Sequence, residues 1–236
     1  MNILAVDTAG KTAGVALLQD DRLLYEVYLD AGMTHSETLM PMIDTCLKMC
    51  GLTCADIDLY AVNAGPGSFT GLRIGVSAAK GLAWAKDLPC CGVSTLEAMA
   101  RGVSDFDGLI VCAMDARRQQ IYHALFRSEN GQLTRLCDDC AIGLEELVDH
   151  LRRLPQPKLV VGDGAQLCYD HLTAAGISCR LASPDHRFQN AAGAALAAAD
   201  MARTGHTCTA QELQPVYLRL SQAERERLAK GLSLTE

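Results

Sequence analysis

The chain has 236 residues, of which 49% are hydrophobic and 21% charged, and 28 acidic side chains outnumber 21 basic ones to give a formal net charge of −7. A chain of this length forms one large domain or two small ones, and its apolar runs are too short for the roughly 20 residues of a membrane-spanning helix. The negative charge, with basic residues scattered along the sequence, argues against a protein that binds nucleic acid on its own.

The first 30 residues predict an antiparallel meander of three strands. Apolar runs at 3–6, 15–18 and 23–28 alternate with polar turns, which is the pattern of short strands joined by hairpins. The first run has no basic flank and no small-residue cleavage site, so we interpret it as a strand rather than a signal peptide. We therefore expect a cytoplasmic protein with no membrane segment.

Two helices are predicted next, over residues 36 to about 50 and 68 to about 86, with a short strand at 59–63 between them. Pro41 is expected to kink the first helix or to delay its start. On both helices the apolar residues exceed a single stripe, which indicates that more than one face needs cover. We predict that the two helices form an interface with a second copy or with another protein, through these residues: Leu39, Met42, Ile43, Cys46, Leu72, Arg73, Ile74 and Val76.

The segment Gly65–Gly75, with the sequence GPGSFTGLRIG, is the most informative stretch of the chain. Backbone N–H groups in a glycine-rich turn before a helix can receive a phosphate. However, the segment has neither the ending of a P-loop nor the spacing of a dinucleotide-binding turn. Small residues three and four positions apart, including Gly71, Gly75 and Ala79, would instead let the helix approach another backbone closely. The sequence favours this packing interpretation.

The rest of the chain predicts a second α/β unit. The expected elements are, in order, a strand at 90–93, a helix from 94 through 99, a meander at 109–133, a helix at 144–154, a strand at 158–161, a helix at 165–175, a strand at 178–181 and a helix at 190–202. At an offset of 108 residues the second meander aligns with the first, with these pairs matched: Asp7 with Asp115, Ala16 with Ala124, and Leu17 with Leu125. The pattern indicates two α/β halves, each with a mixed sheet.

We predict three parts from this element order. Residues 1–103 form a first subdomain, which the segment 190–220 rejoins, and residues 104–189 form a second subdomain. Residues 221–236 are rich in charge and are expected to form a loose terminal helix or a tail.

Eleven cysteines are a high and odd number. Several of them, including Cys46, Cys90 and Cys112, lie in apolar runs, and we interpret them as small buried side chains rather than disulfide partners. The one CxxC pair, Cys137 and Cys140, has no second pair at matching spacing. It therefore does not predict a zinc site.

Four motifs make the chain similar to the TsaB (YeaZ) family. They are Ile3–Thr8, His35–Glu37 with Leu39 and Pro41, Gly65–Ala83, and Met114–Arg117. The resemblance implies an actin-like ATPase fold, homodimerisation, and a complex with the enzyme TsaD and the ATPase TsaE. It also implies a role in transferring threonylcarbamoyl to N6 of adenosine 37 in tRNAs that read ANN codons, with tRNA bound only through the complex.

The resemblance further implies a role without catalysis. TsaD has a related fold and holds a metal through two histidines and an aspartate, at positions that align with Thr95, Met99 and Gln189 here. A hydroxyl, a thioether and a neutral amide do not replace those ligands, so we expect no metal site, no catalytic residue and no cofactor, with ATP and a metal ion on the partner subunits. Asp7, where this fold keeps an acid near phosphates, is a weak candidate for cofactor binding, and Asp163 would repel a nucleotide.

Two other functions stay open. An ATPase or a hydrolase of the same fold, in line with an older glycoprotease interpretation of the family, would need a nucleophile or a base. His35 has no orienting acid in the sequence, and Ser68 lies outside a GxSxG turn. A protein that binds tRNA alone would show an affinity that falls steeply with salt. The sequence favours a non-catalytic partner subunit over both.

Overall fold

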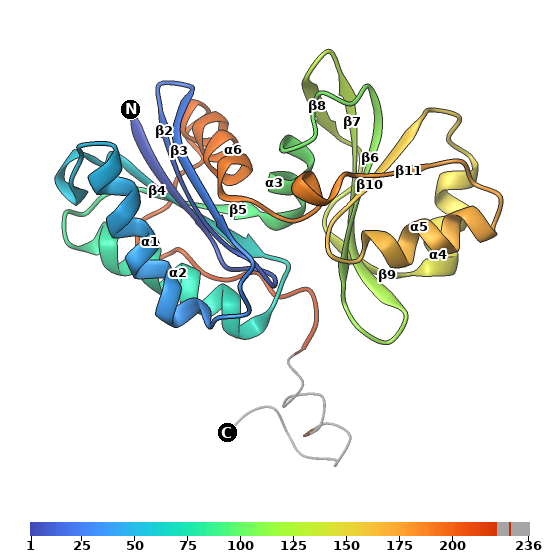
Figure 1. The fold of residues 1–236 in the computed structure, drawn as a ribbon, viewed down its shortest axis with the longest axis horizontal. Helices are drawn as coiled ribbons and strands as arrows, with labels where there is room; N and C mark the ends of the chain where they lie inside the picture. Colours follow the sequence, from blue (N-terminus) through green and yellow to red (C-terminus); the bar gives the residue numbers. More distant parts are fainter. Residues whose placement is uncertain (221–226, 228–236) are drawn as a thin grey trace.

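The computed structural model describes residues 1–220 and residue 227, which form two α/β subdomains side by side (Figure 1). The tail predicted for residues 221–236 lies, apart from residue 227, outside the described residues. Each subdomain is built around one mixed sheet, as the sequence predicted.

The first sheet has the strand order β3-β2-β1-β4-β5. Its strands are β1 (Asn2–Asp7), β2 (Ala13–Gln19), β3 (Arg22–Leu29), β4 (Leu59–Gly65) and β5 (Cys90–Ser94). The first three strands are antiparallel neighbours, and β4 and β5 run parallel to β1. The predicted meander is therefore confirmed.

The second sheet repeats this arrangement with the order β11-β10-β6-β7-β8, and β9 pairs with the other half of β7. Its strands are β6 (Gly108–Asp115), β7 (Gln120–Glu129), β8 (Gln132–Arg135), β9 (Cys140–Gly143), β10 (Lys158–Val161) and β11 (Arg180–Leu181). β6 and β7 are antiparallel, and β10 and β11 run parallel to β6. The same strand order and directions in both sheets support an internal duplication.

Helices cover both faces of each sheet (Figure 1). They are α1 (His35–Met49), α2 (Phe69–Trp84), α3 (Thr95–Arg101), α4 (Leu144–Arg152), α5 (Ala165–Ala174) and α6 (Ala191–Arg203), with 3-10 turns at Cys54–Asp56 and Pro184–His186. α1 and α2 cover one face of the first sheet and α6 the other. α4 and α5 cover one face of the second sheet, and α3 packs between its other face and α6. Within the part of the chain that is described, no helix is both long and apolar enough to span a bilayer.

Successive side chains along each strand point to opposite faces of the sheet, so both faces are packed against helices. Leu4 and Val6 pack toward α1 and α2, whereas Ile3 and Ala5 pack toward α6. α1 begins at His35 and continues through Pro41, so the predicted late start is wrong. Pro41 is exposed, which lets water satisfy the carbonyl that its missing N–H leaves free.

The offset of 108 residues holds for the first strand of each meander but not for the second. Ala5 pairs with Ala16, and the matching residue Ala113 pairs with His123. The offset is therefore 107 in the second strands, because the β6–β7 turn (116–119) is one residue shorter than the β1–β2 turn (8–12). The predicted match of Ala16 with Ala124 was wrong by one position, and so was that of Leu17 with Leu125.

All eleven cysteines lie in the described part of the chain and are free thiols. Cys46, Cys90 and Cys112 are buried, as predicted. Burial raises the pKa of Cys46 to about 12. Cys137 accepts a hydrogen bond from the backbone N–H of Leu125 at 3.1 Å, so this half-buried thiol has a packing role in the second sheet.

Candidate functional site

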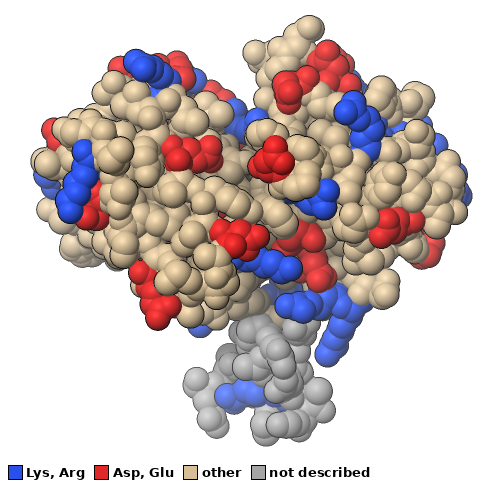
Figure 2. All heavy atoms as spheres, in the orientation of Figure 1, with Lys and Arg blue, Asp and Glu red and all other residues tan. Residues whose placement is uncertain are grey.

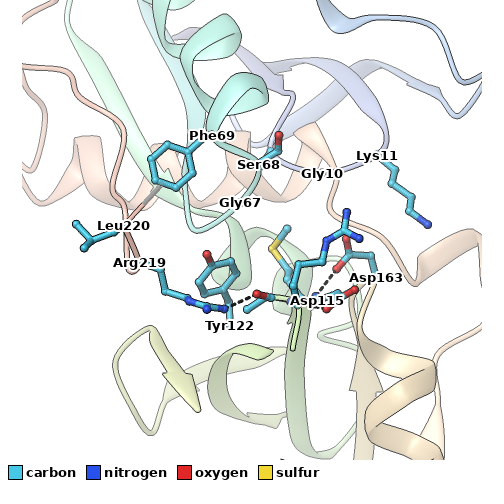
Figure 3. A pocket seen from close by; sticks show the side chains of 14 residues that line it. Gly10, Lys11, Gly67, Ser68, Phe69, Asp115, Tyr122, Asp163, Arg219 and Leu220 are labelled. Carbon is cyan, nitrogen blue, oxygen red and sulfur yellow. Dashed lines mark hydrogen bonds between the residues drawn. The ribbon is translucent and has the colours of Figure 1, made fainter. Parts of the chain in front are cut away.

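A pocket of about 530 Å³ lies where the two subdomains meet (Figure 3). The first subdomain contributes the β1–β2 turn and the start of α2, and the second contributes the end of β6, the turn after it and the loop after β10. The residues that line it are Ala9, Gly10, Lys11, Gly67, Ser68, Phe69, Met114, Asp115, Ala116, Arg117, Tyr122, Asp163, Arg219 and Leu220. The pocket is therefore built from equivalent turns of the two duplicated halves.

The equivalent acids Asp7 and Asp115 build these turns in the same way. Asp7 Oδ1 accepts the N–H of Ala9 at 3.0 Å, and Asp115 Oδ1 accepts the N–H of Arg117 at 2.7 Å. In both cases the carboxylate bonds the residue two positions on, which fixes the start of the turn. The aspartate motif of each half is thus explained by local turn structure.

The two acids differ in what surrounds them. Asp115 is exposed and lines the pocket, whereas Asp7 is fully buried and does not line it. Burial raises the pKa of Asp7 to about 6, an effect that the amide of Asn63 and the N–H of Ala9 partly offset. Asp7 Oδ2 has no hydrogen-bond partner. The sequence candidate for cofactor binding is thus separated from the pocket by the turn that it supports.

The pocket holds charges of both signs. Asp163 accepts the backbone N–H of Asp115 at 2.9 Å, and burial raises the pKa of Asp163. Lys11, Arg117 and Arg219 supply positive charge on the other walls. The carboxylates of Asp115 and Asp163 would repel a phosphate chain, whereas the three cations would attract one. On the face drawn in Figure 2, acidic and basic side chains are interspersed over both subdomains.

The glycine-rich segment packs closely against the β1–β2 turn. A Cβ at Gly67 would lie 2.4 Å from the Ala9 carbonyl oxygen, and one at Gly71 would lie 2.0 Å from that of Thr8. Thr8 Oγ1 also donates to the Gly71 carbonyl at 2.7 Å. The packing interpretation is therefore confirmed.

The N–H groups at the start of α2 are partly occupied by the protein itself. The N–H of Ser68 donates to the Ala9 carbonyl at 2.7 Å, and Ser68 Oγ accepts the N–H of Gly71 at 3.3 Å. Ser68 is thus a helix cap, with its hydroxyl committed to α2. These contacts leave the turn less able to cradle a phosphate than its glycines suggested.

The positions aligned with the metal ligands of TsaD are all buried. Met99 packs in the core between α3 and the second sheet, and Gln189 Nε2 donates to Thr12 Oγ1 at 3.1 Å. Thr95 Oγ1 and Gln189 Oε1 have no hydrogen-bond partner. Among the described residues, no group of three or more His, Cys, Asp or Glu is placed to hold a metal ion.

His35, the other sequence candidate for a catalytic base, has a structural partner. It is the first residue of α1, and its Nε2 lies 2.9 Å from the carbonyl oxygen of Gly10. This contact fixes the β1–β2 turn to the helix, as expected for a residue at a helix N-terminus. His35 does not line the pocket.

The predicted interface residues are mostly in the core, which corrects the sequence interpretation. Six of them are buried against the first sheet: Leu39, Met42, Ile43, Cys46, Leu72 and Val76. Their wide apolar stripe arises because α1 and α2 pack on each other as well as on the sheet. Ile74 is half-buried and Arg73 is exposed. The apolar side chains that do reach the surface of these helices include Met40, 48% exposed, and Trp84, 65% exposed.

Sequence reasoning missed the C-terminal segment as part of the site. Arg219 and Leu220 line the pocket, and Tyr217 stacks on Phe69 with 4.2 Å between ring centroids and 4° between ring planes. The only sequence signal was Pro215-Val216-Tyr217, a short extended run before the charged tail.

Comparisons with known proteins place the chain in a family. A family model described as TsaD, tRNA N6-adenosine threonylcarbamoyltransferase, matches residues 29–226. A Bacillus subtilis protein named tRNA threonylcarbamoyladenosine biosynthesis protein TsaB is 36% identical over 230 residues, which cover 95% of this chain and 96% of the relative. The Escherichia coli protein of the same name is 33% identical over 222 residues, covering 93% and 95%.

Solved structures agree with this placement. A Pseudomonas aeruginosa protein described as similar to peptidase YEAZ aligns with a TM-score of 0.79 and 25% identity, over 92% of this chain and 99% of that one. A ROK hexokinase from Thermus thermophilus aligns with a TM-score of 0.50 and 13% identity, over 87% and 100%, which shows the fold alone. The shared fold is the actin-like ATPase fold of sugar kinases, here with two related subdomains. The chain belongs to the TsaB family.

Proposed function

We propose that this chain is a non-catalytic partner subunit of the machinery that transfers threonylcarbamoyl to N6 of adenosine 37 in tRNAs reading ANN codons. It acts in the cytoplasm together with TsaD and TsaE, and it forms a homodimer when alone. The observation that carries the proposal is the match along almost the whole chain to proteins named for threonylcarbamoyladenosine biosynthesis.

The pocket supports the non-catalytic part of the proposal. Its candidate nucleophile Ser68 caps α2, and its acids Asp115 and Asp163 are engaged with the backbone of the second subdomain. Thr95, Met99 and Gln189 are poor metal ligands in a buried environment. In this proposal ATP and a metal ion are bound by the partner subunits, and tRNA is bound through the complex.

Because most of the predicted interface residues on α1 and α2 are buried, the proposed partner surface must consist of the exposed residues of these helices. Met40 on α1 and Arg73 on α2 replace the buried residues as its candidate members. Methionine and arginine are both enriched in protein interfaces.

The experiment is to mix the purified chain with TsaD and measure the mass of the complex by size-exclusion chromatography with light scattering. We expect a complex at micromolar concentration, and Met40→Glu should weaken it at least tenfold, because a charge would be buried at the interface. Leu167→Glu, at another exposed apolar position, 37% exposed on α5 against 48% for Met40, is the matched control. Equal binding by the two variants would show that the surface on α1 is wrong, and no complex with the unaltered chain would contradict the partnership itself.

The alternative function, an ATPase or a hydrolase, makes a different prediction. Turnover of ATP by the isolated chain would have to depend on a group that lines the pocket, of which Asp115 is the best placed. Steady-state ATP hydrolysis that Asp115→Ala abolishes would favour this alternative over the proposal.

A further inference from the structure

The segment that follows α6 is fixed to the first subdomain. Cys208 and Cys90 exchange two backbone hydrogen bonds, at 2.8 and 2.9 Å. Leu213 is buried in the core beneath α2, and Lys80 Nζ donates to the carbonyl oxygens of Gln211 and Leu213 at 3.2 and 3.0 Å. Residues 208–213 are therefore held against the first subdomain before the chain reaches the pocket.

At the pocket the same segment is anchored to α2. The N–H of Val216 donates to the Ala64 carbonyl at 2.7 Å, and the ring of Tyr217 lies flat on Phe69. Arg73 Nε donates to the Tyr217 hydroxyl at 3.0 Å. Tyr217 is thus held by stacking and by a charge-assisted hydrogen bond, both from the first subdomain.

Two residues later the segment contacts the second subdomain. Arg219 donates from its guanidinium to the Ala116 carbonyl oxygen, which lies in the β6–β7 turn (Figure 3). That turn contains three consecutive non-glycine residues with positive φ, namely Arg117 at 67°, Arg118 at 56° and Gln119 at 61°. L-residues disfavour this region by about 1–2 kcal/mol each. The turn is therefore a strained element that depends on the contacts around it.

The distance between the two anchors is limited by the chain. Tyr217 and Arg219 are two residues apart, so their Cα atoms can separate by about 7 Å at most. Because Tyr217 is tied to α2, a movement of the β6–β7 turn away from the first subdomain must break either the Arg219 contact or the Tyr217 anchor. Leu220, the next residue, lies in the wall of the pocket.

We propose that residues 216–219 form an interdomain strap that ties α2 to the β6–β7 turn and so sets how far the pocket opens. In the strapped state described here, Arg219 joins the turn to the segment that Tyr217 anchors on α2. Release of either anchor frees the turn, which then relaxes its positive φ angles and moves with the second subdomain. The strap couples the Tyr217 anchor in the first subdomain to the Arg219 contact in the second, so the loss of one has the same effect as the loss of the other.

The test is amide hydrogen exchange of the full-length chain, read by mass spectrometry in peptides that cover residues 8–11, 64–73 and 115–120. The variants are Tyr217→Ala, Arg219→Ala and the double variant. Arg180→Ala is the matched control, because Arg180 lies 5.8 Å over the ring of Phe106 in the second subdomain and does not line the pocket. Tyr217→Phe is a milder variant that keeps the stacking on Phe69 and removes only the hydroxyl.

We expect each single variant to speed exchange in 115–120 by between about twofold and tenfold, the range that corresponds to the loss of one aromatic pair. The double variant should add little to either single one, and Tyr217→Phe should give a smaller change in the same peptide. The result that would overturn the strap is local behaviour, in which Tyr217→Ala changes exchange only in 64–73 and Arg219→Ala only in 115–120. Fully additive effects in the double variant would overturn it as well.

Discussion

Asp7 and Asp115 occupy equivalent turns of the two subdomains but lie in different environments. Both carboxylates accept the N–H of the residue two positions on. Asp115 lies in the wall of the pocket, whereas Asp7 is fully buried and its Oδ2 has no hydrogen-bond partner. A buried carboxylate that keeps its charge destabilises the folded state, since burial penalises the charged form.

The first prediction concerns Asp7→Asn. The folded pKa of Asp7 is raised to about 6, so the stabilising contribution of its neutral form is complete below the unfolded pKa of about 4 and is lost as the pH rises through 6. The asparagine stays neutral and can donate to Asn63 Oδ1, which has no partner. Asp7→Asn should therefore raise the free energy of unfolding by roughly 2 kcal/mol at pH 7.5 and by much less at pH 4.

Urea unfolding of both proteins at the two pH values measures this difference. Asp115→Asn is the control, because that acid occupies the equivalent turn at an exposed position. A gain from Asp7→Asn that is the same at pH 4 and pH 7.5 would contradict the predicted titration of Asp7.

Helix α2 is the element that joins the core to the site. Its first turn is capped by Ser68, its glycines meet the β1–β2 turn, and its exposed face carries Arg73, which holds Tyr217. Gly71 and Gly81 lie on the same helix in opposite environments. A Cβ at Gly71 would meet a backbone oxygen, whereas a Cβ at Gly81 would meet nothing within 4 Å.

The second prediction compares Gly71→Ala with Gly81→Ala. At Gly71 the added Cβ would lie 2.0 Å from the Thr8 carbonyl, so the helix or the turn must move, and we expect a loss of about 2 kcal/mol in the free energy of unfolding. At Gly81 the same change should add up to about 1 kcal/mol, because alanine is the better helix former. Thermal unfolding of the two variants measures the loss of stability at Gly71 and the gain at Gly81. Equal changes in the two variants would refute the packing role of Gly71.

The elements could be predicted from the sequence more completely than the site. Apolar runs separated by polar turns identified β1 to β3, and the helix predicted from residue 94 corresponds to α3, which Ser94 caps. The interface prediction on Leu39 and Leu72 failed because a wide apolar stripe looks the same whether it is covered by a neighbouring helix or by another protein. The stacking of Tyr217 on Phe69 and the contact of Asn63 with Asn190 join segments more than 100 residues apart, which local sequence patterns do not report.

At the scale of the whole molecule, a chain of ion pairs joins the two subdomains away from the pocket. Arg135 of β8 contacts Glu97 of α3 at 3.2 Å and Asp139 at 2.6 Å. Glu97 also contacts Arg101 at 3.0 Å, and Arg101 contacts Asp200 of α6 at 2.8 Å. Their side chains, except that of Asp200, are less than a third exposed, so salt screens these pairs less than pairs on the open surface. The network and the strap therefore join the subdomains at separate places.

The third prediction tests this network with Glu97→Gln. The change removes the charge shared by two arginines but leaves Arg135 with Asp139 and Arg101 with Asp200, so we expect a loss of about 1 kcal/mol in the free energy of unfolding. Asp44→Asn, which breaks an exposed pair with Lys48, is the control and should cost less than about 0.5 kcal/mol. Urea unfolding of the two variants in low and high salt measures these losses in the free energy of unfolding. A smaller loss for Glu97→Gln than for Asp44→Asn would contradict a structural role for the network.

The proposed function requires the chain for threonylcarbamoyl transfer, although the chain does not itself perform the reaction. The most direct measurement is a reconstituted reaction of TsaD, TsaE, threonylcarbamoyl-AMP, ATP and unmodified tRNA, with modified adenosine quantified by mass spectrometry in the presence and absence of this chain. We expect modification only when the chain and its partners are present together, no modification by the chain alone, and reduced modification with Met40→Glu but not with Leu167→Glu. Full modification without the chain, or modification by the chain alone, would contradict a required but non-catalytic role.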